Sequence, residues 1–469
     1  MRPLLRLFSI ALVFSGIITS GDPQAAAANA EPNVCPKCIQ DNLKALASDD
    51  MKGRGSGSED EHGAANFVAS KLKEYGAQPA GDNGDYIQAA TVLRRKATGP
   101  PTLTAGTVTL VYGKDFVISR LSAEKFSGPL RKLNAEDPNA QLAAGDVALV
   151  TGKDRSNTRK LAAGAGTVAI GVLTVGKDDK AEHFAAAGKE LPKLAAKIQG
   201  NKSTGMAGDL NMLDLTDEAI KKLSTVADDT KVEFNIPAED EAAGHTWNAV
   251  GVLPGSDPSL AHAAILFSAH LDHLGVGKPV NGDSIYNGAD DDASGTVAVL
   301  ELARVLGSGD KPKRTVIFAL FGSEELGGFG ATYFHQHSPV PLADIAANLE
   351  FEMIGRGDSA VKSDTLWLTG WERSNLGPTL AEHGAKLVAD PHPKENFFAR
   401  SDNYVLAKQG VVAQTISSFG LHADYHQPSD DVAHIDFKHM DAAIGSLLKP
   451  VEWLVNSDFK PEWKPGGKP

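Results

Sequence analysis

Short apolar segments alternate with helical segments through the second half of the chain, and this alternation limits the available folds more than any other feature. The apolar segments are "AAILFSAH", "RTVIFALF", "AANLEFEMIG", "DTLWLTG" and "VVAQTISSF". Strands that alternate with helices are typical of a mostly parallel sheet covered by helices on both faces. We therefore expect an α/β fold in which a mostly parallel or mixed sheet lies between two helical layers.

One of the intervening helices is well marked in "SGTVAVLELARVLG". Its apolar residues recur at helical spacing along one stripe, namely Val299, Leu302, Ala303 and Leu306. Ser294 is the candidate N-cap of this helix, and Gly307 is the residue at which we expect it to end.

The pattern of helical and β-type runs is different in the residues that precede this region. Residues 31–100 contain two helical patterns around a loop rich in Gly and Ser, whereas residues 101–240 contain β-type runs such as "TVTLVYG" and "GDVALVTG". This middle block has no cluster of His, Asp and Glu that could form a reaction centre. We interpret it as an inserted, smaller β-rich or α+β domain, with residues 31–100 and 241–460 forming the main domain.

The first thirty residues have the pattern of a secretory signal peptide. Arg2 and Arg6 precede an apolar stretch that runs to Ile18, and "QAAAANA" offers small residues for cleavage. An uncleaved anchor is the alternative, although the stretch is short for a membrane span. We expect an exported protein, periplasmic or extracellular, with no stable membrane insertion after cleavage.

The only two cysteines are Cys35 and Cys38, in "CPKC". In an exported protein this spacing favours a local disulfide over a redox site or half of a metal site. Because so small a ring restricts the unfolded chain very little, we expect it to contribute little to stability.

The formal net charge of the chain is −13. This acidic balance argues against nucleic acid or anionic membrane as the main partner, because both favour clustered Lys and Arg. Solubility is the simpler explanation of the charge.

Residues that can bind metal follow three of the predicted strands: His270 and Asp272, then Glu324 and Glu325, then Glu350 and Glu352. Two loop segments supply further imidazole and carboxylate groups: Asp290, Asp291, Asp292, His422, Asp424, His426 and Asp430. In an open parallel sheet, functional groups gather beyond the carboxyl ends of the strands. We therefore expect these side chains to converge.

Each of these motifs has a simpler explanation when it is taken alone. A His and an Asp separated by one residue commonly lie in a surface turn, three aspartates before a helix could complement the helix dipole, and adjacent glutamates usually face solvent. Their coincidence at strand ends and in adjoining loops favours a metal site.

A mixture of imidazole and carboxylate groups favours Zn²⁺ over Mg²⁺ or Ca²⁺, with Mn²⁺ or Co²⁺ as substitutes. A catalytic zinc ion normally takes three protein ligands, so two histidines and three carboxylates are too many for one ion. They suit two ions that share a carboxylate. Two ions about 3.5 to 4 Å apart can activate one water together.

These segments resemble the family 28 zinc metallopeptidases, the co-catalytic di-zinc aminopeptidases. The resemblance rests on "SAHLDHLG", "YNGADDDASGTVAVLELAR", "FGSEELGGFGATYF", "FEMIGR" and "DYHQPSD", in this order. It implies the di-zinc exopeptidase fold. The middle block lies where many members carry a protease-associated domain, and "KLAAGAGTVAIGVLTV" is similar to one.

The resemblance also implies roles for individual residues. One zinc ion would be held by His270, Asp291 and Glu352, and the other by Asp291, Glu325 and His426, so that Asp291 bridges the two ions. Family members often have Asn and Asp at the positions of Glu350 and Glu352, which leaves the geometry of the longer Glu352 ligand open.

Three further roles follow from the same resemblance. Glu324 would be the general base, which takes a proton from the shared water and passes it to the leaving amine. Tyr425 would donate a hydrogen bond to the oxyanion, and Asp272 would orient His270 through its second ring nitrogen. Supporting or structural positions are expected for His273, His422, Asp290, Asp292 and Asp430. Asn403 replaces a frequent histidine, so the pocket from Arg400 to Tyr404 is poorly defined by the resemblance.

The leading hypothesis is an exported di-zinc aminopeptidase that acts on peptides. A carboxypeptidase or dipeptidase on the same scaffold would need a cation for the substrate carboxylate, which the sequence does not locate. A glutaminyl cyclase and a non-catalytic binding ectodomain are further alternatives, although the ectodomain would be expected to lack ligands or the base. Side-chain specificity, the role of the insert and the oligomeric state are left open.

Overall fold

The computed structural model describes residues 33–121, 123–137, 139–143, 145–152, 168–171, 184–200 and 211–469. The predicted signal peptide lies outside these residues. Among the described helices, none combines the length and the apolar character needed to cross a bilayer.

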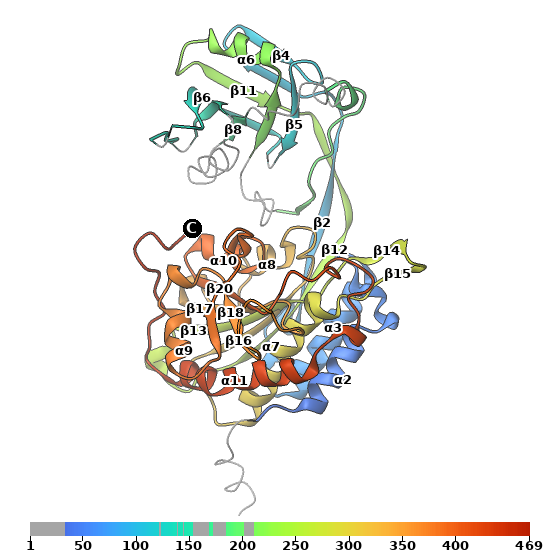
Figure 1. Ribbon diagram of the computed structural model, residues 1–469, viewed down its shortest axis with the longest axis vertical. Coiled ribbons are helices and arrows are strands. Elements are labelled where there is room, and N and C mark those ends of the chain that lie inside the picture. The colour runs from blue at the N-terminus through green and yellow to red at the C-terminus, as the bar shows by residue number, and fades with distance from the viewer. Residues whose placement is uncertain are drawn as a thin grey trace, which may run out of the picture. The chain divides into compact units, whose positions relative to one another are not determined.

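In the main sheet, the strands that lead to the predicted metal ligands are neighbours (Figure 1). Its order is β19 (Leu387–Ala389), β18 (Leu366–Leu368), β20 (Val412–Ser417), β17 (Ile345–Phe351), β13 (Ala264–His270), β16 (Val316–Phe321), β12 (Ala238–Leu253), β2 (Ile87–Ala97) and β9 (Lys197–Ile198), with β1 (Gln78–Pro79) paired to β12. β13 is parallel to both β16 and β17, and β17 is parallel to β20. Since β12 and β18 run antiparallel to their neighbours β16 and β20, the predicted mixed sheet is confirmed.

Helices cover both faces of this sheet. One face packs against α2 (Pro36–Leu46), α3 (Glu59–Glu74), α7 (Gly295–Ser308), α9 (Leu376–Glu382) and α11 (Phe437–Asn456), and the other against α8 (Phe329–Phe334) and α10 (Asn403–Gln409). Successive residues of a strand face opposite sides, so Phe267 and Phe318 join the first core while Leu266 and Ile317 join the second. The central strands are apolar at nearly every position because both of their faces are buried.

The prediction for α7 places Ser294 correctly at the N-cap position but is wrong about its capping bond and about the last residue of the helix. Ser294 makes no side-chain capping bond, and the N–H of Gly295 donates instead to Asp292 Oδ1 at 2.9 Å. The helix also continues through Gly307 to Ser308. A glycine is needed at this point because a Cβ on Gly307 would lie 1.9 Å from the main-chain oxygen of Tyr75.

Most of the described strands between β2 and β12 form a second sheet with its own core, whereas β9 pairs with β2 in the main sheet. The order of the second sheet is β4 (Val108–Val111), β3 (Thr102–Ala105), β11 (Lys231–Asn235), β6 (Lys125–Asn134), β7 (Val147–Thr151), β8 (Val168–Gly171), β10 (Met212–Leu215) and β5 (Phe116–Arg120). Leu103, Phe116 and Phe234 are buried in this core, to which α6 (Asp217–Ser224) also contributes. An inserted β-rich unit is therefore present, and its relation to protease-associated domains stays a prediction.

This unit is joined to the main sheet by the antiparallel ladder of β2 and β12, and β9 also pairs antiparallel with β2. β2 pairs with β12 from Ile87 opposite Ala249 to Ala97 opposite Ala238, and the second half of β12 continues along β16.

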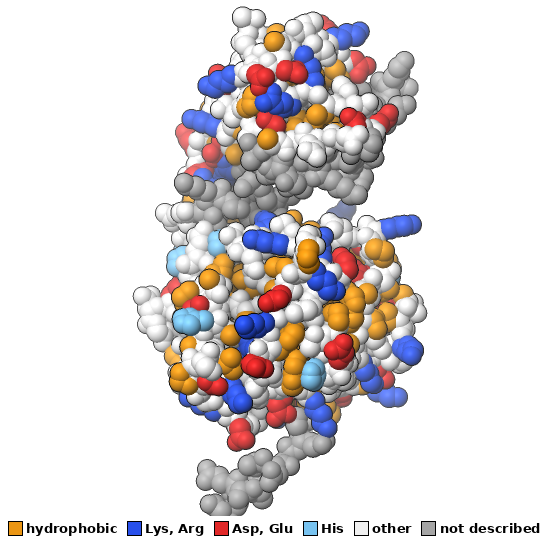
Figure 2. Space-filling view, turned by 90° about the vertical axis from the view of Figure 1, so that its left-hand side faces the viewer, with side chains coloured by type: hydrophobic (Ala, Val, Ile, Leu, Met, Phe, Trp, Pro, Cys, Tyr) orange, Lys and Arg blue, Asp and Glu red, His pale blue; other side chains and the backbone are white. Residues whose placement is uncertain are grey.

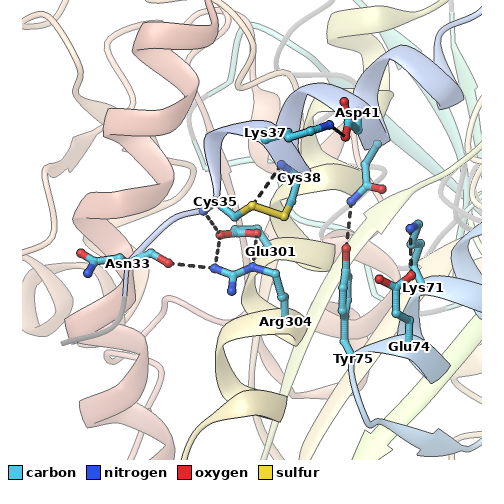
Figure 3. Close-up of a disulfide and its surroundings, with 11 residues drawn as sticks. Asn33, Cys35, Lys37, Cys38, Asp41, Lys71, Glu74, Tyr75, Glu301 and Arg304 are labelled. Atoms are coloured by element: carbon cyan, nitrogen blue, oxygen red, sulfur yellow. Dashed lines mark hydrogen bonds and ion pairs between the residues drawn. A yellow bond between two sulfur atoms is a disulfide. The ribbon is translucent and has the colours of Figure 1, made fainter. Parts of the chain in front are cut away.

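The N-terminal end of the described chain is tied to α7 (Figure 3). Cys35 and Cys38 form the predicted disulfide at the start of α2. The N–H of Cys35 donates to Glu301 Oε1 at 2.6 Å, and Arg304 donates to both Glu301 and the main-chain oxygen of Asn33. The disulfide therefore lies at the contact between α2 and α7.

Candidate metal centre

The parallel strands bring the predicted ligands to one edge of the main sheet. His270 ends β13, Glu325 follows β16 and Glu352 follows β17, while Asp291 lies in the loop that precedes α7. His426 arrives from the loop between β20 and α11. The strand order thus explains why residues far apart in the sequence meet here.

The first donor set consists of His270, Asp291 and Glu352. Their ligand atoms lie within 4.8 Å of one another, and His270 Nε2 is 3.2 Å from Asp291 Oδ1. Burial raises the pKa of Glu352 to about 8, Glu350 and Asp291 add to the shift, and His270 opposes it. A divalent cation would neutralise the negative charge that this set concentrates in a buried place.

The second donor set uses the other oxygen of Asp291. His426 Nε2 lies 3.3 Å from Asp291 Oδ2 and 3.2 Å from Glu325 Oε1. His273 joins the same set, because its ligand atom lies within 4.8 Å of those of Asp291 and Glu325. Asp291 therefore offers one oxygen to each set, which is the arrangement that a bridging carboxylate requires.

Unpaired buried atoms provide a test of whether these residues suit a metal ion. His270 Nε2 and Glu325 Oε1 are buried without a hydrogen-bond partner in the described part of the chain. Leaving such atoms unpaired is costly in a protein interior. Their separations and their imidazole and carboxylate chemistry fit ions of the zinc type.

The histidine of the exposed loop is strongly affected by the carboxylates around it. Burial alone lowers the pKa of His426, but Asp291 and Glu325 raise it to about 10. In the absence of other cations, this imidazole would be the group that balances the charge of the two acids.

The three consecutive aspartates make three different sets of contacts. Asp291 alone belongs to the donor sets. The carboxylate of Asp292 accepts the N–H of Met353 at 3.0 Å, and that of Asp290 accepts the N–H of Gly355 at 2.7 Å. Asp290 and Asp292 therefore hold the chain that follows β17, and Asp292 also accepts the N–H of Gly295 at the start of α7.

The other predicted supporting residues brace the same loop. His422 Nε2 lies 2.9 Å from Asp290 Oδ2, and Asp430 accepts the N–H groups of Asp290 and Asp291 at 3.0 Å. Arg356 in turn pairs with Asp430 and Asp424.

Glu324 belongs to neither donor set, although it is adjacent to Glu325. Its side chain is only 7% exposed. Burial raises its pKa well above the ordinary value; His270 opposes this effect, and Glu325 and Asp402 add to it. Glu324 is therefore held close to the two donor sets but belongs to neither. A carboxylate in such a position is suited to proton transfer.

The contacts of Asp272 differ in part from the role that the resemblance implies. His270 Nδ1 lies 3.1 Å from the main-chain oxygen of Asp272 and 3.6 Å from its Oδ1. The carboxylate instead accepts the N–H of Glu324, the N–H of Glu325 and the hydroxyl of Ser56.

Tyr425 lies between the centre and a pocket. Its ring stacks on that of His426, with centroids 3.8 Å apart, and burial raises the pKa of its hydroxyl well above the ordinary value. The pocket beside it is lined by Glu352, Met353, Trp367, Thr369, Phe397, Arg400, Thr415, Ser417, Phe419 and Tyr425. Four of these residues are aromatic, and Arg400 supplies a cation.

Two charged residues with structural roles at the centre are missed by the sequence analysis. Arg54 is fully buried and donates to four main-chain oxygens, which belong to Leu46, Leu271, Asn287 and Gly288. It thereby joins the loop after β13 to the loop before Asp291. A lone arginine in a glycine-rich loop carries no spacing signal, so nothing in the sequence marks it.

Glu61 is the second such residue. Its buried carboxylate accepts hydrogen bonds from Gly57 N, Trp247 N, the Thr246 hydroxyl and the Ser323 hydroxyl, at 2.7 to 2.9 Å. Ser323 precedes Glu324 and has a positive φ of 52°. Glu61 therefore fixes the turn from which Glu324 extends.

Comparisons with known proteins agree with this geometry. The model of Peptidase family M28 matches residues 248–449. The chain is 27% identical over 224 residues to Leucine aminopeptidase 1 of Pyrenophora tritici-repentis, which covers 47% of this chain and 54% of that protein. It is 30% identical over 168 residues to Leupeptin-inactivating enzyme 1 of Streptomyces exfoliatus, which covers 35% and 34%. The chain thus spans about half, or less, of the length of these relatives.

Solved structures with a similar chain path include a zinc aminopeptidase from Bacillus subtilis, with 19% identity and a TM-score of 0.48 over 92% of this chain and 97% of that one. An aminopeptidase from Aneurinibacillus sp. strain AM-1 gives 18% identity and a TM-score of 0.49 over 92% and 97%.

Proposed function

We propose that this chain, which belongs to peptidase family M28, is an exported aminopeptidase that uses two zinc ions to hydrolyse the N-terminal bond of peptides. The observation that carries the proposal is the pair of donor sets that share Asp291, with Glu324 beside them and outside both. A structural metal site would not need a spare buried carboxylate next to its ligands.

Two zinc ions, when bound, supply Lewis-acid activation of the attacking water and of the scissile carbonyl. The chain's own part in the reaction is proton transfer and positioning. Glu324 accepts a proton from the attacking water and delivers it to the nitrogen of the departing amine. Because Glu324 belongs to neither donor set, its carboxylate is free to carry that proton.

Tyr425 is placed to stabilise the negative charge that develops on the carbonyl oxygen. Its hydroxyl is kept protonated by burial, so it can donate a hydrogen bond at neutral pH. Its ring stacks on that of His426, which lies beside the second donor set.

The pocket beside the centre suits an apolar residue at the amino end of the substrate. Met353, Trp367, Phe397 and Phe419 supply apolar side chains to its wall, and Glu352 and Tyr425 connect it to the donor sets. Burying an apolar side chain there would contribute about 1.5 to 3 kcal/mol to binding. The names of the leucine aminopeptidases among the relatives support the same substrate class.

Arg400 favours a second candidate, a carboxypeptidase or dipeptidase. It lines the same pocket, and its guanidinium lies over the ring of Phe397 with its carbon 4.9 Å from the centroid. Its one ion pair among the described contacts, to Glu395, is long at 3.7 Å, and its side chain is 41% exposed. It could therefore receive a substrate carboxylate.

Export is supported by the composition of the first thirty residues and by the disulfide between Cys35 and Cys38. On the face seen in Figure 2, acidic and basic side chains are interspersed over the described residues, which suits a soluble enzyme of peptides better than a nucleic-acid binder.

The test is to measure zinc in the purified protein and to compare hydrolysis of a free peptide with its N-acetylated and C-amidated forms. We expect two zinc ions per chain, cleavage of the C-amidated peptide, and loss of cleavage on N-acetylation. Undiminished hydrolysis of the N-acetylated peptide would sink the aminopeptidase proposal. If C-amidation of the peptide prevents its cleavage, and Arg400→Gln prevents cleavage of the free peptide, the second candidate is established.

A further inference from the structure

His273 has the position of a metal ligand, although the family resemblance implies only a supporting role for it. Its Nδ1 lies 2.9 Å from Glu325 Oε1 and 3.8 Å from Asp291 Oδ2. The side chain is completely buried, and neither ring nitrogen has a hydrogen-bond partner in the described part of the chain. A buried imidazole without a hydrogen bond at either nitrogen is unusual and requires an explanation.

The backbone holds this ring in place. The N–H of His273 donates to the main-chain oxygen of Arg54, and its own oxygen accepts the N–H of Ser56, both at 3.1 Å. On another side, Gly288 leaves room for the ring, since a Cβ there would lie 2.5 Å from the Cγ of His273. The direction of Nδ1 toward Glu325 is therefore set by the fold.

A second imidazole reaches the same two oxygens from a different loop. His426 Nε2 lies 3.2 Å from Glu325 Oε1 and 3.3 Å from Asp291 Oδ2, and the two rings are perpendicular within about 20°, with an interplanar angle of 72°. Ligands about 2.0 to 2.2 Å from a tetrahedral ion are about 3.3 to 3.5 Å apart. The four nitrogen-to-oxygen separations, from 2.9 to 3.8 Å, lie around this value.

We propose that His273 is a fourth protein ligand of the second metal ion, bound through Nδ1 together with His426, Asp291 and Glu325. The two sites are then unequal. The second has two imidazoles among its four protein ligands and would take the shared water as a fifth ligand, whereas the first has one imidazole and two carboxylates.

This inequality predicts an order of metal binding. Two imidazoles and a larger number of protein ligands favour zinc in the second site, which should therefore bind first and release last. The first site, richer in oxygen, should exchange its ion more readily and accept Mn²⁺. This inference rests on the proposed function only in requiring that the donor sets bind metal.

The alternative is that His273 is a protonated partner of Glu325, with no contact to metal. The number of imidazoles bound to the metal distinguishes these two possibilities. In the protein loaded with Co²⁺, each bound histidine contributes one hyperfine-shifted exchangeable N–H signal in the proton NMR spectrum. We expect three such signals, from His270, His273 and His426, and only two would overturn the proposal.

Variants provide a second measurement on the full chain. His273→Gln should weaken the tighter of the two zinc sites by at least about 10-fold in a chelator competition, and should remove one shifted signal. The matched control is His439→Gln, because His439 is 3% exposed and bonds to Ser418 outside both donor sets. Two zinc ions bound by His273→Gln with unchanged affinities would also overturn the proposal.

These readouts do not depend on peptide hydrolysis. A protein that shows three bound imidazoles and cleaves no peptide would reject the proposed function and leave the ligand assignment standing. If His273→Gln fails to fold, the signal count in the unmodified protein still decides.

Discussion

Asp272 Oδ1 accepts the main-chain N–H of Glu324 at 3.0 Å, and so joins the loop after β13 to the loop after β16. The second oxygen accepts the N–H of Glu325 at 3.3 Å. One carboxylate therefore fixes the starting points of two side chains that we assign to different roles, a proton carrier and a metal ligand.

The Asp272→Asn variant tests whether this carboxylate positions Glu324 and Glu325. An amide has one accepting oxygen, so one of the two N–H groups would lose its partner and the turn would shift. Because a misplacement of about 1 Å can reduce turnover about 10²-fold, we expect kcat to fall by that order while two zinc ions remain bound. Asp257→Asn is the control, since Asp257 caps an exposed turn through Ser259. An unchanged kcat would contradict the role.

The adjacent glutamates should separate in their effects. Glu324→Gln should retain both metal ions and lose at least about 10²-fold in kcat, the usual scale for a lost acid or base. Glu325→Gln should instead weaken metal binding, because Glu325 belongs to a donor set. Zinc analysis and steady-state kinetics of the two variants decide. Loss of zinc from Glu324→Gln would show that the two roles are exchanged.

Asp291→Asn tests the shared ligand. If Asp291 offers an oxygen to each donor set, its loss should weaken both, and the zinc content should fall below two per chain. The measurement is zinc content after dialysis against a weak chelator. Asp344→Asn serves as the control, because Asp344 contacts only His262 among the ion pairs described. Full occupancy in Asp291→Asn would refute the bridge.

Glu61 should matter for catalysis although it lies outside the donor sets. Glu61→Ala leaves four donors without their acceptor, and each buried unsatisfied group costs about 1 to 3 kcal/mol. We expect a lower melting temperature and a kcat reduced about 10-fold or more, with zinc content unchanged. Ser323→Ala removes one of these contacts and should lower kcat with little loss of stability. If neither variant alters kcat, Glu61 has no part in placing Glu324.

The insert should respond to acid through Asp115. Burial by itself would raise the pKa of Asp115, but Lys222, 2.8 Å from Oδ1, and the N–H of Val111 hold it below the ordinary value. The fold therefore favours the ionised form, so the stabilisation is present above the unfolded pKa of about 3.9 and is lost as pH falls through the folded pKa.

The measurement is thermal unfolding of the full chain and of Asp115→Asn between about pH 6 and pH 2. The variant should melt lower at pH 6, and the difference should shrink as the pH falls below about 4. A difference that is constant across this range would show that Asp115 does not carry the pH dependence.

The sequence predicts the main sheet and the convergence at its edge because each strand is recognisable locally. His270, Glu325 and Glu352 lie at the ends of apolar runs, and parallel pairing of those runs is enough to bring them together. Similarly, the strands of the insert are visible as separate β-type runs.

The features that the sequence does not predict depend on contacts between distant residues. Ser294 has the local pattern of an N-cap, yet its hydroxyl accepts the N–H of Ile354 from the loop after β17, and Asp292 makes the capping bond. Arg54 and Glu61 are defined by partners more than 180 positions away, such as Asn287 and Trp247. The position of His273 beside Glu325 depends in the same way on the pairing of β13 with β16.

The ladder of β2 and β12 shows where the insert could be separated from the main domain. Ala97 and Ala238 are paired neighbours at its far end, so residues 98–237 occupy the place of a hairpin turn. These residues also supply β9, which pairs with β2 at the edge of the main sheet, so replacing them with a two-residue turn such as Asn-Gly would keep the β2–β12 ladder closed and would remove only that edge strand. The insert is therefore a module on a hairpin, and the same junction could accept a different module without a change in the order of the catalytic strands.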